Sequence, residues 1–299
     1  MRTAIIDLGT NTFHLLISDG LKPLYEERRA VRLGMGGIND GMITPEAIGR
    51  AIDCLRDYAD LARTHAASQL LAFGTSALRN AKNREEVCGL ISTETGIQVK
   101  VISGEEEASL IWEGIRAAMV IGDQPGLIVD IGGGSVEFIV ATSERMLWKR
   151  SLEIGGQRLI EKFQHHDPIL PEEITSVEQY LDQSLGEVRE ILRGYDPSTL
   201  IGSSGSFDTL SEIHCLRTLI PYPSTPETPL TLDSFSSIHQ ELITRDRAGR
   251  MAIPGMIDLR VDMIVVASIL IRYLLKVHPF SQIRISSFSL KEGVRATLA

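Results

Sequence analysis

The sequence has few cysteines and no long uninterrupted apolar run. Its three cysteines, Cys54, Cys88 and Cys215, are odd in number and form no C-x-x-C pair. This usage indicates free thiols in a reducing compartment rather than a disulfide framework. The most apolar late segment, residues 263–276, is interrupted by Arg272 after nine residues. A membrane-spanning helix needs about 20 apolar residues, so we predict a core helix instead.

Positive charge is also scarce. The chain has 30 Lys and Arg against 39 Asp and Glu, a net charge of −9. This balance argues against a nucleic-acid partner, which requires a basic surface. The N-terminal apolar run is interrupted at Asp7 and is too short for a signal peptide, so we expect a cytoplasmic protein without a membrane partner. An anionic substrate would need local positive charge, backbone N–H groups or a metal ion.

Several catalytic signatures are missing. No glycine loop carries the Walker lysine, which excludes a P-loop NTPase. No G-x-G-x-x-G supports a dinucleotide site, and no G-x-S-x-G indicates a serine hydrolase. The seven histidines have no metal-ligand spacing.

The chain contains a weak internal repeat. A strand, an aspartate, a glycine loop and a second strand occur in "AIIDLGTNTFHLLIS" and again in "LIVDIGGGSVEFIVA". Predicted strands alternate with predicted helices, as in layered α/β proteins. We therefore predict an α/β fold of two similar lobes, 1–124 and 125–299, separated at "GDQPG". The closing helix near 290–299 is expected to pack back on the first lobe.

Two details of the second lobe are also predicted. Residues 171–192 have the pattern of one amphipathic helix. Residues 221–229, "PYPSTPETP", are rich in proline and are expected to form a surface loop.

Three glycine-rich turns follow strands, at 7–12, 130–135 and 202–206. Glycine lets the backbone approach a phosphate closely and point its N–H groups at the oxygens. The third turn leads into a helix, whose N-terminus attracts anions. One such turn would suggest only tight packing, but three at matching places favour phosphate binding.

Acidic residues accompany these turns. Asp7 and Asp130 either cap their turns or hold Mg²⁺ across a cleft. Glu137, on the outgoing strand, either faces solvent or folds back beside Asp130. The run Glu105–Glu107 complements the dipole of a helix N-terminus, or it supplies a general base. Arg79 is either a surface residue or a phosphate ligand.

These motifs resemble the exopolyphosphatase / guanosine pentaphosphate phosphohydrolase family. The similar segments are "AIIDLGTNTFHLLI", "RLGMGGINDGMIT", "FGTSALRNAKN", "VISGEEEASLI", "VDIGGGSVEF", "IGSSGSFDTL" and "IPGMIDLRVDMIVVASIL". The resemblance implies an actin-like (ribonuclease H-like) fold with the active site between the lobes. It also implies Mg²⁺-dependent hydrolysis of a terminal phosphoanhydride, in inorganic polyphosphate or guanosine pentaphosphate. A homodimer is a further family-level expectation.

The resemblance also implies roles for individual residues. Glu107 corresponds to the catalytic glutamate, with Glu106 as the alternative. Asp130 and Glu137 would assist catalysis and, with Asp7, hold the metal. The residues expected to bind phosphate are Gly9, Thr10, Asn11, Arg79, Gly132, Gly133, Gly134, Ser135, Gly205 and Ser206.

The sequence departs from the family pattern near its end. Ser289 stands where a glycine is usual, and Lys291 stands where an arginine is usual. Longer members carry additional C-terminal helical domains, whereas this sequence contains the two core lobes. Two other functions stay open: an ATP-dependent small-molecule kinase of the actin-like superfamily, and a non-catalytic sensor of alarmone or polyphosphate.

Overall fold

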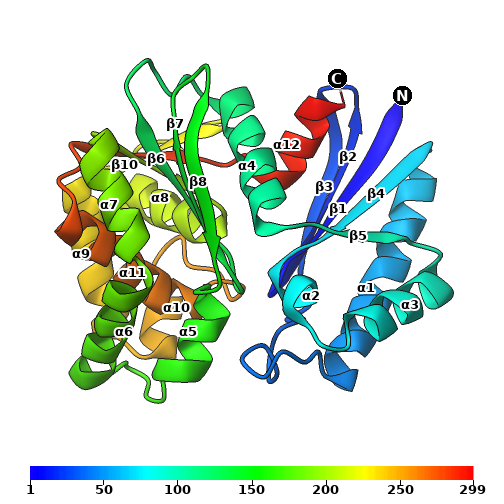
Figure 1. Ribbon diagram of the computed structural model, residues 1–299, viewed down its shortest axis with the longest axis horizontal. Coiled ribbons are helices and arrows are strands. Elements are labelled where there is room, and N and C mark those ends of the chain that lie inside the picture. Colours follow the sequence, from blue (N-terminus) through cyan, green and yellow to red (C-terminus); the bar gives the residue numbers. More distant parts are fainter. Residues whose placement is uncertain (299) are drawn as a thin grey trace.

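The computed structural model describes residues 1–298 and contains two mixed β-sheets, one in each of two lobes (Figure 1). Ala299, the end of the predicted second lobe, lies outside the described residues. The first sheet consists of β1 (Arg2–Leu8), β2 (Thr12–Asp19), β3 (Lys22–Ala30), β4 (Gln69–Gly74) and β5 (Val99–Val101). The second consists of β6 (Gly126–Ile131), β7 (Val136–Ala141), β8 (Met146–Leu152), β9 (Thr199–Ser203), β10 (Glu227–Leu230) and β11 (Gln282–Ser286).

The two sheets share one strand pattern. In the order β3-β2-β1-β4-β5, the first two pairings are antiparallel and the next two are parallel. The order β8-β7-β6-β9-β11 repeats this sequence of directions, and β10 adds an antiparallel edge strand. The predicted α/β fold of two similar lobes is therefore confirmed. Asp7 and Asp130 occupy equivalent places, near the ends of the central strands β1 and β6.

Helices cover the outer face of each sheet. In the first lobe these are α1 (Pro45–Thr64) and α3 (Arg84–Thr95), while the short α2 (Ser76–Asn80) follows β4. Leu55 and Tyr58 of α1 pack in one apolar cluster with Ile6 and Phe13 of the sheet. The helical spacing of the apolar residues in α1 places them on this one face.

The second lobe has more helices. These are α5 (Gly156–Phe163), α6 (Pro171–Ser184), α7 (Gly186–Tyr195), α8 (Gly205–Thr218), α9 (Leu232–Thr244), α10 (Arg247–Met251) and α11 (Met263–Val277). The apolar segment predicted as a core helix is α11, most of whose residues are buried. In the described part of the chain, no helix combines the length and apolar character needed to cross a membrane.

A central layer joins the lobes. It consists of α4 (Gly104–Ala118) and α12 (Leu290–Thr297), which lie between the two sheets in Figure 1. Ile111 of α4 and Val294 of α12 share an apolar cluster with Ile5 of the first sheet and Ile128 and Ile201 of the second. Burial against both sheets fixes α4 in the middle of the molecule.

One local prediction was wrong, and a second holds only for residues 221–226. The helix expected over 171–192 is divided, because Leu185 leaves the helical conformation (φ −100°, ψ 20°) directly before Gly186, a poor helix former. The loop expected over 221–229 ends in β10, where Pro229 pairs with Arg284. Proline is tolerated there because β10 is an edge strand and its missing N–H is not needed for a second neighbour.

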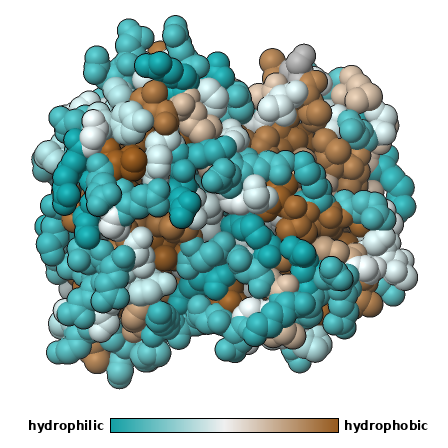
Figure 2. Space-filling model, in the orientation of Figure 1, coloured by the Kyte–Doolittle hydropathy of each residue, from teal (hydrophilic) through white to brown (hydrophobic). Residues whose placement is uncertain are grey.

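The face of the molecule shown in Figure 2 is mostly hydrophilic. Apolar side chains gather on it over the first lobe, beside α12.

Candidate active site

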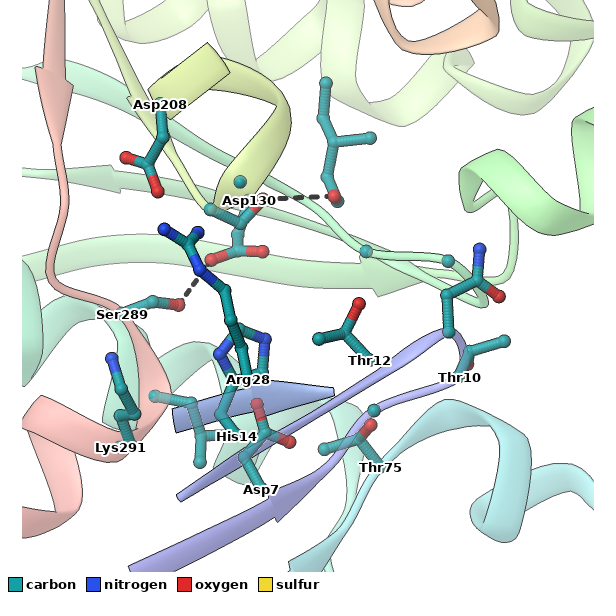
Figure 3. Close-up of a pocket in the computed structure, with 18 of the residues that line it drawn as sticks. Asp7, Thr10, Thr12, His14, Arg28, Thr75, Asp130, Asp208, Ser289 and Lys291 are labelled. Atoms are coloured by element: carbon teal, nitrogen blue, oxygen red, sulfur yellow. Dashed lines mark hydrogen bonds between the residues drawn. The ribbon is translucent and has the colours of Figure 1, made fainter. Parts of the chain in front are cut away.

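A cavity of about 720 Å³ separates the two lobes. Its wall includes the loops after β1 and β6, the N-terminal turn of α8 and the segment that enters α12 (Figure 3). Eleven of the predicted site residues line it: Asp7, Gly9, Thr10, Asn11, Glu107, Asp130, Gly132, Gly133, Gly134, Ser135 and Gly205. The packing of the two lobes against each other thus brings together residues more than 190 positions apart, such as Asp7 and Gly205.

The loops of the two repeats touch each other on this wall. A Cβ on Gly134 would lie 2.3 Å from Ser76 Oγ and 2.5 Å from Thr10 Oγ1. A Cβ on Gly133 would lie about 3 Å from the Asn11 side chain. Glycine is therefore required there for the close approach of the lobes, in addition to any contact with a ligand.

Asp130 and Glu137 lie opposite each other. They are directly paired in the register of β6 and β7, so both side chains are on the same face of the second sheet. Glu137 is 1% exposed, accepts a hydrogen bond from Ser151 (2.6 Å) and does not line the cavity. Strand pairing thus places Glu137 behind Asp130 as seen from the cavity.

Two hydroxyl groups orient Asp130. Ser203 Oγ and Ser289 Oγ both donate to Asp130 Oδ2, at 2.8 and 2.6 Å. Ser289, at a position where the sequence departs from the family pattern, thus supplies a contact that no local motif indicated.

Glu107 lies in the first turn of α4, which Ser103 caps by accepting from the Glu106 N–H. Its side chain lines the cavity and accepts a hydrogen bond from Arg79 Nη1 at 2.7 Å. Burial raises the pKa of Glu107 to about 7, although Arg79 opposes this shift. Glu106 instead forms an ion pair with Lys100 near the surface. The geometry therefore favours Glu107 over Glu106 as a proton acceptor.

Burial and mutual repulsion raise the pKa values of the neighbouring carboxyl groups. The pKa of Asp7 lies well above its ordinary value because of burial, with Glu107 and Asp130 adding to the shift. The pKa values of Asp130 and Glu137 are also raised, mainly by burial. A cation placed among these groups would favour their charged forms.

The site fits a magnesium ion that keeps part of its water shell. Asp7 Oδ1 and Asn11 Oδ1 are buried oxygens without a hydrogen-bond partner. Within residues 1–298, no three His, Cys, Asp or Glu side chains are grouped closely enough to bind a metal on their own. Mg²⁺ commonly binds through one or two carboxylates together with waters and substrate phosphates, which suits Asp7 and Asp130.

Three basic side chains on the cavity wall were missed by the sequence analysis. Arg28 comes from β3 and Lys291 from α12 (Figure 3). Arg260 comes from the segment before α11. Burial lowers the pKa of Arg260 to about 10, which leaves it charged at neutral pH. Burial opposes the charge of Lys291, but Glu292 and Glu26 raise its pKa. Their wide separation along the chain left no local pattern by which to group them, although Lys291 stands where an arginine is usual in the family pattern.

The remaining predicted site residues do not line the cavity. Ser206 is fully buried in the first turn of α8. Arg79 lies behind Glu107, where it contacts Glu107, Glu153 and Ser135. In this arrangement Arg79 contacts carboxylates and a hydroxyl group rather than facing the open cavity.

Comparisons with known proteins agree with this architecture. The sequence model of the Ppx/GppA phosphatase family matches residues 15–299. Exopolyphosphatase 2 of Mycobacterium tuberculosis is 30% identical over 315 aligned positions, which cover all of this chain and 98% of the relative. The crystal structure of an exopolyphosphatase from Cytophaga hutchinsonii is 41% identical, with a TM-score of 0.96 over 100% of this chain and 97% of the other. The Aquifex aeolicus PPX-GPPA enzyme is 26% identical, with a TM-score of 0.78 and 99% of both chains covered.

Proposed function

Because the chain belongs to the Ppx/GppA phosphatase family, we propose that it hydrolyses the terminal phosphoanhydride of inorganic polyphosphate and releases orthophosphate. The observation that carries the proposal is Glu107, whose carboxylate has a pKa of about 7 and shares one cavity with both Asp-Gly loops. The names of the mycobacterial and Cytophaga relatives support polyphosphate as the substrate. Guanosine pentaphosphate presents the same kind of terminal anhydride and is the second candidate substrate.

The cavity suits a polyanion despite the acidic composition of the chain. Backbone N–H groups of the two glycine loops and of the α8 N-terminus can donate to phosphate oxygens. Arg28, Arg260 and Lys291 add positive charge on the same wall. His14 adds none at neutral pH, because burial and these three cations lower its pKa well below the ordinary value.

The proposed reaction is an in-line attack of water on the terminal phosphorus. Glu107 orients the water and accepts its proton while the oxygen–phosphorus bond forms. The bond to the bridging oxygen breaks, and the shortened chain leaves with the electron pair. The loop N–H groups and the basic side chains stabilise negative charge on the phosphoryl oxygens.

Mg²⁺ is the proposed cofactor. Asp7 and Asp130 would hold it, with Asn11 Oδ1 as a neutral oxygen donor. Glu137 is paired with Asp130 but does not line the cavity, so it would not contact the ion directly. When bound, the ion supplies positive charge to the phosphate oxygens and relieves repulsion among the carboxylates.

Phosphate release from short polyphosphate, long polyphosphate and guanosine pentaphosphate, each with and without Mg²⁺, tests the proposal. We expect Mg²⁺-dependent release from polyphosphate, and the ratio of the rates identifies the preferred substrate. Phosphorylation of an added small acceptor by ATP would instead indicate the kinase. Tight binding of a guanosine polyphosphate in calorimetry, without any phosphate release, would indicate the sensor.

A further inference from the structure

Glu153 connects the two lobes directly behind Glu107. It follows β8 in the second lobe, and both of its carboxylate oxygens are engaged. Oε1 accepts from Arg79 Nη2 at 3.0 Å, and Oε2 accepts from Ser76 Oγ and from Arg158 Nη2. Ser76 and Arg79 belong to α2 of the first lobe, whereas Arg158 belongs to α5 of the second.

The guanidinium of Arg79 lies between two carboxylates. Nη1 donates to Glu107 and Nη2 donates to Glu153, so the two acids bind different nitrogens of one planar group. Arg79 is largely shielded, since its side chain is 15% exposed. In a rigid guanidinium, the direction of one nitrogen determines the direction of the other. Nη1 and Nη2 have one further, longer contact each, to Ile102 O and Ser135 Oγ, both at 3.4 Å. The shorter, charge-assisted Glu153 contact is therefore the main one that sets how Arg79 presents Nη1 to Glu107.

We propose that Glu153 is a positioning residue that acts through Arg79 to fix the orientation of the Glu107 carboxylate. This inference rests on the proposed function of Glu107 as the proton acceptor. Charge-assisted hydrogen bonds between arginine and carboxylate are strong and directional, so their loss frees the guanidinium to turn. Misorientation of Glu107 affects the attack on phosphorus. The donors to Glu153 are Ser76, Arg79 and Arg158, so the basic residues Arg28, Arg260 and Lys291 keep their places on the cavity wall. Two of these donors also contact the 132–135 loop, Arg79 at Ser135 and Arg158 at Gly134.

A second contact between the lobes provides a matched control. Glu161 of α5 accepts from the Gly36 N–H at 2.9 Å and lies 3.5 Å from Asn39 Nδ2, both in the first lobe. These contacts involve neither Arg79 nor Glu107. Glu161→Gln therefore makes the same chemical change at another contact between the lobes without altering the support of Glu107.

The test compares Glu153→Gln and Glu161→Gln with the wild type, using phosphate release from a short polyphosphate. We expect Glu153→Gln to lower kcat about 10- to 100-fold with KM unchanged within about twofold, since small displacements of catalytic groups cost this much. Glu161→Gln is expected to retain the wild-type kcat. A wild-type kcat in Glu153→Gln, or an equal loss in Glu161→Gln, would overturn the proposal. If Glu153→Gln does not fold, Glu153→Asp is measured against the same expectations.

A readout that does not depend on turnover separates this inference from the proposed function. Arginine side-chain ¹⁵N NMR, with Arg79 assigned through Arg79→Lys, reports rotation of the guanidinium. We expect slowly exchanging Nη signals in the wild type and in Glu161→Gln, and averaged signals in Glu153→Gln. Absence of phosphate release from the wild type would contradict the proposed function alone. Averaged signals in the wild type would contradict the role of Glu153.

Discussion

Among single residues, Glu107 is the proposed proton acceptor, and its side chain is buried yet lines the cavity. Replacement by glutamine preserves the shape but removes the proton acceptor. We expect Glu107→Gln to lower kcat for phosphate release by about 10²–10⁴-fold, the usual contribution of a general base. Substrate binding, measured by calorimetry, should change little.

Glu106→Gln is the matched control for Glu107→Gln. Glu106 is the preceding residue on the same helix, and its carboxylate pairs with Lys100 rather than lining the cavity. We expect turnover close to the wild type. The reverse result, with Glu106→Gln inactive and Glu107→Gln active, would assign the base to Glu106.

The pKa of about 7 at Glu107 also predicts a pH dependence. Burial raises this pKa, and a general base acts in its deprotonated form. The value of kcat/KM should therefore fall about tenfold per pH unit below the pKa and be level above it. Bound Mg²⁺ favours the charged carboxylate, so the midpoint is expected at or below about 7. A flat profile on the acidic side would contradict this role.

At the scale of secondary-structure elements, the close packing of α4 on α12 determines where Glu107 lies. A Cβ on Gly293 of α12 would lie 1.7 Å from the backbone oxygen of Leu110 in α4. A Cβ on Gly114 would lie 2.2 Å from the backbone oxygen of Ser289. Backbone atoms cannot move aside as side chains do, so the two helices can approach this closely only with glycine at the contact.

Gly293→Ala is therefore expected to push α12 away from α4. Overpacking of this kind typically costs about 1–3 kcal/mol. We expect the free energy of unfolding to fall by about 3 kcal/mol or more, because the clash is with backbone atoms. Urea unfolding measures the change. Gly89→Ala in α3 is the control, because its Cβ would meet no atom within 4 Å. Alanine should stabilise that helix by up to about 1 kcal/mol. Equal stability of the two variants would contradict the close contact of α4 and α12.

At the scale of the whole molecule, the chain has a net charge of −9 and places acidic groups in its central cavity. The pKa values of Asp7 and Glu137 lie well above their ordinary values of 3.8 and 4.5 because of burial and mutual repulsion. The folded chain thus retains protons on these groups at pH values where the unfolded chain has lost them. The free energy of unfolding consequently decreases as the pH rises above about 4, until the folded-state pKa values are passed.

A cation that binds only the folded protein offsets this loss. We expect MgCl₂ to raise the melting temperature, and to raise it more at about pH 8 than at about pH 6, because the ion needs deprotonated ligands. Asp7→Asn should lose most of the Mg²⁺ response. Asp53→Asn, which changes an exposed carboxylate on α1, should keep it. An unchanged response in Asp7→Asn would contradict its role as a ligand.

The sequence by itself determined the features that depend on residues adjacent along the chain. Asp7 and Asp130 before their glycine loops, Glu107 in the first turn of a helix and the repeated strand pattern all follow from local backbone preferences. The repeat also indicated two similar lobes. It did not reveal the break at Leu185, where Gly186 is the local signal, or the edge strand at Pro229, which forms only by pairing with β11.

Only the tertiary structure decided which distant side chains meet in the cavity and directly behind it. Arg28, Arg260 and Lys291 converge there, Ser289 reaches Asp130, and Glu153 reaches Arg79. Ser289 and Asp130 are 159 positions apart along the chain, and Glu153 and Arg79 are 74 positions apart. Their meeting depends on how the apolar faces of both sheets are buried against α4 and α12, which no local pattern specifies.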